Sequence, residues 1–156
     1  MEKLDVLNQV AAFHHTFGHP VPQVPAIPNA ERCTLRLSLL REELEELEEA
    51  VAAKDIVAVA DALCDLQYVL IGAVLEFGLG DRFKLLFDEV QRSNMSKSCN
   101  NLEEAQQTQA HYLQNKGVES IVEPSGDKYL VFRLSDRKTL KSLHYSPANL
   151  ADILQK

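Results

Sequence analysis

Apolar residues recur at helical spacing along most of the chain, and glycines and prolines interrupt this pattern. Leu4, Leu7 and Val10 lie on one face of a helix predicted over residues 2–17, which ends at Gly18. Four prolines between residues 20 and 28 then predict an extended segment, because proline cannot continue a helix and restricts the residue before it.

Two long helices are predicted after the proline-rich segment. Asn29 is a suitable N-cap for a helix over residues 30–53, and Asp55 for a third helix that ends near residue 77, before Gly78 and Gly80. The apolar positions of the helix at 30–53 alternate steps of four and three, as in the seam of a bundle: Cys33, Leu37, Leu40, Leu44, Leu47 and Val51. The third helix is apolar on nearly every side, so we expect it to be the central and most buried helix.

Shorter elements follow. A fourth helix is predicted from Asp81 to Met95, and a fifth begins after Asn100 or Asn101 and ends at residues 115–117. The period then changes, and residues 118–122 and 129–134 predict a β-hairpin around a turn at 124–127, with a short helix after Pro147. We therefore predict an all-α fold, a bundle of four or five helices with a small C-terminal β-hairpin appendage. Residues 1–117 would form the helical domain, and residues 118–156 would extend it.

Charge and cysteine content narrow the classes of partner and compartment. Sixteen basic residues against 23 acidic ones give a net charge of −7, which argues against a nucleic-acid partner. A small anionic ligand would fit if a cation bridged it to the protein. Three widely spaced cysteines and an N-terminus without an apolar signal segment predict a cytoplasmic protein. The apolar stretch 56–75 contains two aspartates, which are costly in lipid, so we predict no membrane partner.

A run of glutamates on the second predicted helix is the first candidate for chemistry. Most such runs form a solvated helix face. On a helical wheel, however, Glu43 falls inside the apolar sector and Glu46 lies at its border, whereas Glu45 and Glu49 point away. Two of these glutamates are therefore expected to face the protein interior.

Two aspartates on the third predicted helix complete the candidate cluster. Asp61 and Asp65 are spaced i, i+4, so both project from one face of an otherwise apolar helix. Because a buried, unpaired carboxylate is costly, two interpretations stay open. In one, the aspartates form structural ion pairs with a basic residue: Arg36, Arg41 or Lys84. In the other, they join Glu43 and Glu46 in one pocket, whose oxygen ligands suit Mg²⁺ or Mn²⁺.

The acidic residues also resemble a family motif. Glu42-Glu43-x-x-Glu46, followed by an apolar helix with Asp65, is similar to the pattern E-E-x-x-E and E-x-x-D of the all-α nucleoside triphosphate pyrophosphohydrolases. That superfamily includes the MazG-like proteins and phosphoribosyl-ATP pyrophosphohydrolase. Residues 88–97 and 145–150 resemble segments of one MazG-like branch.

The resemblance implies a MazG-like bundle that hydrolyses a nucleoside or deoxynucleoside triphosphate between its α and β phosphates, giving the monophosphate and pyrophosphate. The implied cofactor is Mg²⁺, with Mn²⁺ as a substitute, and the implied metal ligands are Glu43, Glu46, Asp61 and Asp65. The chain departs from the family pattern at Ala62, where the pattern has Glu. Asp61, one residue earlier, is expected to substitute for it.

Further roles are implied for residues around these ligands. Glu42 would belong to the catalytic set with Glu43 and Glu46, by binding a second ion or orienting the attacking water. Asn94 and Lys97 would contact phosphate oxygens of the substrate, although a lysine at this place also suits the helix dipole alone. The family implies a homodimer or homotetramer.

Two other functions stay open. A non-catalytic helical scaffold would pair Asp61 and Asp65 with basic residues and would bind no divalent cation. A phosphoribosyl-ATP pyrophosphohydrolase of histidine synthesis would share the bundle, but the C-terminal extension and Ala62 favour a nucleoside triphosphate.

Overall fold

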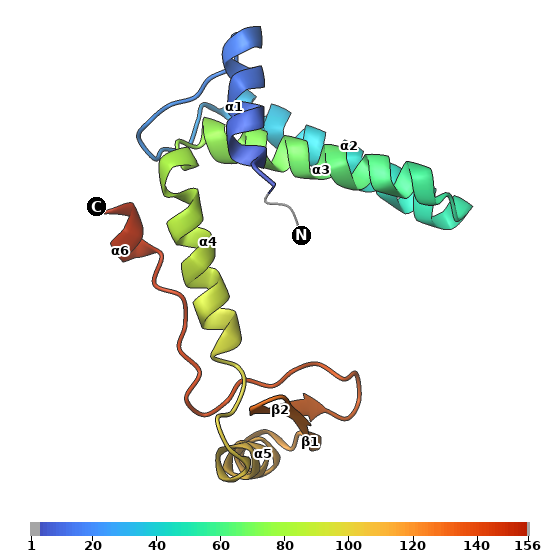
Figure 1. Ribbon diagram of the computed structural model, residues 1–156, viewed down its shortest axis with the longest axis vertical. Helices are drawn as coiled ribbons and strands as arrows, with labels where there is room; N and C mark the ends of the chain where they lie inside the picture. Colours follow the sequence, from blue (N-terminus) through green and yellow to red (C-terminus); the bar gives the residue numbers. More distant parts are fainter. Residues whose placement is uncertain (1–3, 156) are drawn as a thin grey trace. The chain divides into compact units, whose positions relative to one another are not determined.

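The computed structural model describes residues 4–155. The predicted start of the first helix at residue 2 therefore lies outside the described residues. The described chain is mostly helical, with six helices and one two-stranded antiparallel sheet, which confirms the predicted fold class (Figure 1). It divides into two compact units, Met1–Lys84 and Leu85–Lys156. The domain boundary expected at residue 117 lies inside the second unit.

The first unit contains three complete helices: α1 (Val6–Phe17), α2 (Ala30–Ala53) and α3 (Ile56–Glu76). The second and third begin and end as their local sequence predicts, whereas the first begins only at Val6 with Asp5 as its N-cap, so Leu4 and Asp5 lie before the helix and not within it as predicted. The side chain of Asn29 accepts a hydrogen bond from the backbone of the first turn of α2, and Asp55 does the same for α3. α1 ends at Gly18 in the left-handed conformation, as its C-cap position favours.

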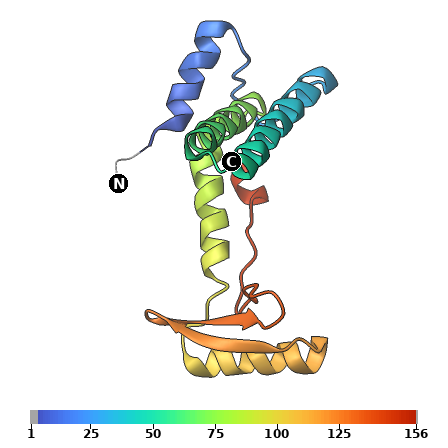
Figure 2. The same ribbon diagram turned by 90° about the vertical axis from the view of Figure 1, so that its right-hand side faces the viewer.

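α2 and α3 form a helical hairpin that runs side by side in both views (Figures 1 and 2). Their connection is short because Lys54 adopts the left-handed conformation and Asp55 already caps α3. α1 packs against α3, and the apolar core of the unit forms there from four buried residues: Val10, Ile71, Val74 and Leu75.

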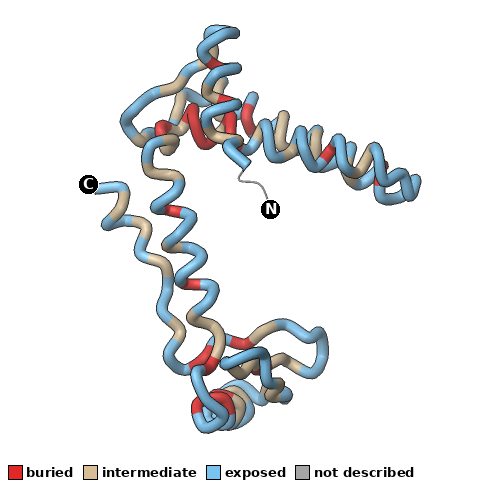
Figure 3. Tube along the Cα trace, in the orientation of Figure 1, coloured by how far each residue is buried: buried red, intermediate tan, exposed pale blue. Residues whose placement is uncertain are grey.

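The prediction that α3 is the most buried helix is wrong for its first half. Its buried positions cluster between residues 71 and 76, whereas Ile56 and Val57 are each 76% exposed and Leu63 is 50% exposed (Figure 3). The reason is that, within this unit, α1 covers only one end of the hairpin. By length and apolar composition alone α3 could span a membrane, a property that the core helices of ordinary bundles share.

The second unit places a helix against a β-hairpin. It contains most of α4 (Gly80–Met95), then α5 (Leu102–Lys116), β1 (Ser120–Ser125), β2 (Lys128–Arg133) and α6 (Ala151–Leu154). α5 packs on the hairpin (Figure 2), and their shared core is formed by four buried residues: Cys99, Ala105, Val131 and Leu140. The hairpin turn is shorter than predicted, because Pro124 already pairs with Tyr129 and only Gly126 and Asp127 connect the strands.

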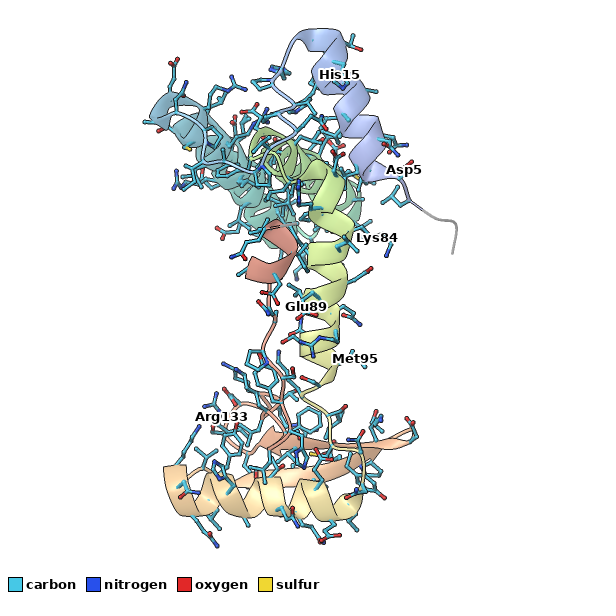
Figure 4. All side chains as sticks on the ribbon, turned by 90° about the vertical axis from the view of Figure 1, so that its left-hand side faces the viewer. Asp5, His15, Lys84, Glu89, Met95 and Arg133 are labelled. Carbon is cyan, nitrogen blue, oxygen red and sulfur yellow. The ribbon has the colours of Figure 1, made fainter. Side chains whose placement is uncertain are left out.

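The C-terminal segment is held along α4 by hydrogen bonds. Asn149 donates its backbone N–H to Glu89 Oε1 at 2.8 Å, and Ser146 donates to Ser96 Oγ at 2.9 Å. Glu89 lies on α4 next to this segment (Figure 4). Hydrogen bonds from Arg92 and from the Asn149 backbone lower the pKa of Glu89 to about 2. The segment therefore has a fixed course in the second unit, although only α6 is regular.

Candidate active site

The α2–α3 hairpin carries the four carboxylates that the sequence singles out, two from each helix. Glu43 is half-buried, whereas Glu46, Asp61 and Asp65 are exposed. Partial burial raises the pKa of Glu43, and the charges of four neighbours raise it further: Glu46, Asp65, Glu42 and Asp61, in that order of effect. The packing of α2 on α3 thus brings these acidic side chains near enough for their charges to act on Glu43.

Within residues 4–155, no basic side chain forms an ion pair with any of these four carboxylates. Neither Asp61 nor Asp65 forms an ion pair or hydrogen bond with another side chain in the part of the chain from residue 4 to 155. Arg36, one of the partners expected in the ion-pair interpretation, instead binds Glu76 at the other end of α3. The structural ion pairs expected in that interpretation are therefore not present in the described part of the chain.

The four carboxylates Glu43, Glu46, Asp61 and Asp65 have the chemistry that a hard divalent cation requires, but their side chains do not point at one common position. All donors are carboxylate oxygens, the ligands that Mg²⁺ and Mn²⁺ prefer. Among the described residues, however, no three Asp, Glu, His or Cys side chains lie close enough together to hold an ion as they stand. Since three of the four carboxylates are exposed, rotation of their side chains would be needed to complete a ligand set.

Ala62, which stands where the family pattern has Glu, differs in burial from Asp61, the residue expected to replace that Glu. Ala62 is only 3% exposed, so its side chain is covered within the unit, whereas Asp61 beside it is exposed. Asp61 therefore projects from a different side of α3 than the residue it is expected to replace. Its charge also affects Glu43 less than that of Asp65 does.

The two expected phosphate ligands lie in the second unit. Asn94 is in the last turn of α4, and Lys97 follows the helix. The two side chains contact each other, because Lys97 Nζ donates a hydrogen bond to Asn94 Oδ1 at 2.7 Å. Their role in binding phosphate stays a prediction.

Sequence reasoning missed a buried charge cluster at the other end of the hairpin. Glu76 is 3% exposed and accepts hydrogen bonds from both Arg32 and Arg36. Burial disfavours its charged form, but the two guanidinium groups outweigh this and lower the pKa of Glu76. The signal in the sequence was a single glutamate at the end of an apolar helix, with two arginines one turn apart on the preceding helix.

A buried histidine belongs to this cluster, and its hydrogen bonds determine which of its ring nitrogens carries the proton. His14 is 2% exposed, and its Nδ1 lies 3.1 Å from the carbonyl oxygen of Pro20, so Nδ1 carries the proton and donates it. Nε2 then accepts from Arg36 Nη2 at 3.4 Å. Burial lowers the pKa of His14, and the charge of Arg36 lowers it further. The cluster thereby ties α1, the proline-rich segment, α2 and α3 together.

Two comparisons with known proteins bear on this hairpin. Residues 10–94, more than half of the chain, match the family model for phosphoribosyl-ATP pyrophosphohydrolase. The matched segment contains all four carboxylates and ends at Asn94. An uncharacterized protein of Acanthamoeba polyphaga mimivirus is 24% identical over 244 aligned positions, which cover 99% of this chain and 97% of the viral protein.

Proposed function

Because the chain belongs to the phosphoribosyl-ATP pyrophosphohydrolase family, a family of pyrophosphohydrolases, we propose that it hydrolyses a nucleoside triphosphate between the α and β phosphates in a Mg²⁺-dependent reaction. The products would be the monophosphate and pyrophosphate. The observation that carries this proposal is the group of carboxylates on α2 and α3. None of them has a basic partner among the described residues, and their charges add to the effect of burial in raising the pKa of Glu43. A cation that bridged them to the phosphates would remove this repulsion.

The acidic residues would have two roles in the proposed reaction, metal binding and orientation of the attacking water. The metal would be held by four carboxylates: Glu43, Glu46, Asp61 and Asp65. When bound, Mg²⁺ or Mn²⁺ polarises phosphate oxygens and lowers the pKa of a coordinated water. Glu42 is exposed next to Glu43, so it would accept a hydrogen bond from the attacking water and orient it.

Conservative variants test the carboxylates directly. We expect Glu46→Gln and Asp65→Asn to lose Mg²⁺ binding and at least about a hundredfold of the pyrophosphate release, since each removes a charged metal ligand. Glu49→Gln is the matched control, because Glu49 is an exposed glutamate of α2 without a predicted role. Equal activity in all three variants would contradict the assignment of the site.

A second substrate is favoured by the name of the matched family. Phosphoribosyl-ATP carries the same bond between α and β phosphates, so the same carboxylates would serve. The buried Ala62, in place of the pattern's Glu, still favours the simpler triphosphate. Turnover of phosphoribosyl-ATP at a higher kcat/KM than any nucleoside triphosphate would reverse this preference.

The non-catalytic scaffold is the remaining alternative. It requires Asp61 and Asp65 to be paired with basic residues, and the described chain offers no such pair. Isothermal titration with Mg²⁺ separates the two functions without an activity assay. Absence of binding at millimolar Mg²⁺, together with no turnover, would favour the scaffold.

We also propose that the helical hairpin of α2 and α3 associates with the same hairpin in a second copy of the chain. Exposed apolar residues recur every seven positions on both helices: Leu37, Leu44 and Val51 on α2, and Ile56, Leu63 and Leu70 on α3. A seven-residue repeat is the spacing at which helices bury a seam against other helices. A helical hairpin with two such stripes forms a four-helix bundle when it meets an identical hairpin.

The oligomeric state tests this association. We expect the wild-type chain to sediment as a dimer or tetramer at micromolar concentration, and the double variant Leu44→Glu/Leu63→Glu to sediment as a folded monomer. Leu113→Glu is the control, since Leu113 is equally exposed but lies on α5 in the second unit. A monomeric wild-type chain would contradict the proposal.

A further inference from the structure

The C-terminal segment brings a second lysine to the end of α4, beside the two residues expected to bind phosphate. Ser142 donates its backbone N–H to the carbonyl oxygen of Lys97 at 3.1 Å, so residues 141 and 142 lie next to Lys97. Lys141 Nζ lies 4.1 Å from the centroid of the Tyr145 ring, and the charges of both lysines act on the Tyr145 hydroxyl. All of these residues belong to the second unit, and Lys141 and Tyr145 lie beyond the segment that matches the family model.

The hydroxyl of Tyr145 is held in place by a buried side chain, and its own proton is available to a ligand. Ser93, which is 5% exposed, donates a hydrogen bond to the Tyr145 hydroxyl oxygen at 3.2 Å. Because a tyrosine hydroxyl can accept and donate at once, the Tyr145 O–H is free to donate to a ligand. The hydrogen bond from Ser93 and the charge of Lys141 lower the pKa of Tyr145, which makes its O–H a stronger donor.

Neither lysine of this group is neutralised by an acidic side chain of the described chain. Lys97 and Lys141 form no ion pair with any residue from 4 to 155. In contrast, each arginine of the second unit binds a carboxylate: Arg92, Arg133 and Arg137. Lys97 Nζ donates to Asn94 Oδ1 at 2.7 Å, an orientation in which the amide nitrogen of Asn94 can donate to a ligand. The group therefore offers two ammonium ions, an amide and a phenol, and all of them are donors.

The distribution of charge between the two units favours the second unit for an anion. Residues 85–156 contain nine basic and nine acidic residues, whereas residues 1–84 contain seven basic and fourteen acidic ones. The whole net charge of −7 therefore belongs to the first unit, and the second can attract an anion without a bridging cation. A phosphate group suits these donors, because its several charged oxygens accept hydrogen bonds from different directions.

We propose that Lys141 and Tyr145 form, together with Lys97 and Asn94, an anion site that binds a phosphate group. This inference deepens the proposed function and rests on it for the ligand, which is then the triphosphate substrate or the pyrophosphate product. Lys141 and Tyr145 are positioning residues, because they hold phosphate oxygens and take no part in breaking the bond. The C-terminal segment thereby acquires a role, since its hydrogen bonds to α4 and to Lys97 hold these two side chains in place.

Calorimetry with inorganic pyrophosphate in EDTA tests the anion site separately from metal and catalysis. We expect Lys141→Gln to weaken the binding of pyrophosphate about tenfold, because it removes a charged donor, and Tyr145→Phe about threefold, because it removes a neutral one. Lys141→Arg keeps the charge and should retain most of the affinity. Lys138→Gln is the matched control, since Lys138 is an exposed lysine of the same segment whose charge acts on Asp136 instead.

Turnover of triphosphates connects the anion site with the proposed reaction. We expect Lys141→Gln to raise the KM for the triphosphate about tenfold, and Lys138→Gln to leave it unchanged. Thermal unfolding shows whether each variant is folded, and Tyr145→Phe carries the test if Lys141→Gln is not.

The two ideas can fail separately. If triphosphates are hydrolysed but neither Lys141→Gln nor Tyr145→Phe alters pyrophosphate affinity, the inference is overturned and the proposed function stands. Absence of pyrophosphate binding to the wild-type chain would overturn the inference as well. If pyrophosphate binds and depends on Lys141 but no triphosphate is hydrolysed, the proposed function fails and the anion site stands.

Discussion

Glu76 is a buried charged residue of the first unit, and two arginines from α2 bind it at the end of α3. Removing one member of a buried ion pair leaves the other charge uncompensated. We therefore expect Glu76→Gln to lower the free energy of unfolding by about 3–5 kcal/mol. Glu123→Gln, which breaks an exposed ion pair with Arg137, should change it little. Urea unfolding of both variants checks this, and equal losses would contradict the structural weight given to Glu76.

His14 makes stability depend on pH through its proton. The folded chain lowers the pKa of His14 from 6.5, so below pH 6.5 the unfolded chain binds more protons than the folded one. The stability that comes from neutral His14 is present above pH 6.5 and is lost as the pH falls through that value. We expect His14→Asn, which keeps a side-chain N–H, to flatten this fall between pH 7.5 and 5.5 in urea unfolding.

His111→Asn is the control for this pH dependence, because His111 is exposed and lies on α5. It should retain the fall in stability seen in the wild-type chain. A wild-type stability that stays constant over this range would show that His14 does not titrate differently in the folded state.

Two glycines that follow the ends of α1 and α3 have the same backbone conformation but different surroundings, so they can be compared by mutation. Gly18 and Gly78 have nearly the same left-handed φ, +71° and +69°. An added Cβ at Gly18 would meet nothing within 4 Å, whereas at Gly78 it would lie 2.1 Å from the carbonyl oxygen of Val24. The proline-rich segment lies against the end of α3 here, where the Ala26 N–H donates to the carbonyl oxygen of Phe77.

Alanine at these two positions should therefore have unequal effects. Gly18→Ala should lower the free energy of unfolding by about 1–2 kcal/mol, the cost of a left-handed conformation for a residue with Cβ. Gly78→Ala should lower it by clearly more, because the backbone of the proline-rich segment must also move. Thermal unfolding of the two variants gives the comparison, and equal losses would mean that this segment is not packed on α3.

Local signals explain why so many elements could be predicted. The caps at Asn29, Asp55 and Gly117 depend on residues within one turn, so the sequence contains all that determines them. The burial of α3 could not be predicted in the same way, since it depends on how many other elements cover the helix. The sequence pattern around an apolar residue such as Leu63 is the same whether its side chain faces the chain's own core or another molecule.

In the candidate site too, features set by local sequence could be predicted, whereas features set by long-range packing could not. The spacing of Glu43, Asp61 and Asp65 within their helices places them on predictable faces, and the helical hairpin then brings the two faces together. The pairing of Arg36 with Glu76 joins residues 40 positions apart. Its prediction needs the register between α2 and α3, which no local pattern contains.

At the scale of the whole molecule, the proposed metal site would couple metal binding to stability. The raised pKa of Glu43 means that its ionised form is disfavoured in the folded chain, so its contribution to stability is present below its usual pKa of 4.5 and is lost as the pH rises through the raised value. A divalent cation bound at the proposed site would reverse this loss. We expect 10 mM Mg²⁺ to raise the melting temperature at pH 7.5, and the increase to shrink as the pH falls toward 5, because protons then compete with the cation for Glu43, whose pKa is raised.

Two variants check the origin of this effect. Asp65→Asn should abolish the increase with Mg²⁺, and Glu49→Gln should retain it. An increase that persisted in Asp65→Asn would place the cation elsewhere on this acidic molecule, whose net charge of −7 attracts divalent ions in general.

The central claim is that the chain cleaves a nucleotide between its α and β phosphates, and identification of the products by mass spectrometry tests it most directly. Triphosphates of all common bases would be incubated with the wild-type chain in Mg²⁺ or in EDTA, beside Asp65→Asn. We predict monophosphate and pyrophosphate in equal amounts with Mg²⁺, and neither product with EDTA or with the variant. Diphosphate and inorganic phosphate as products, or no turnover of any triphosphate or of phosphoribosyl-ATP, would contradict it.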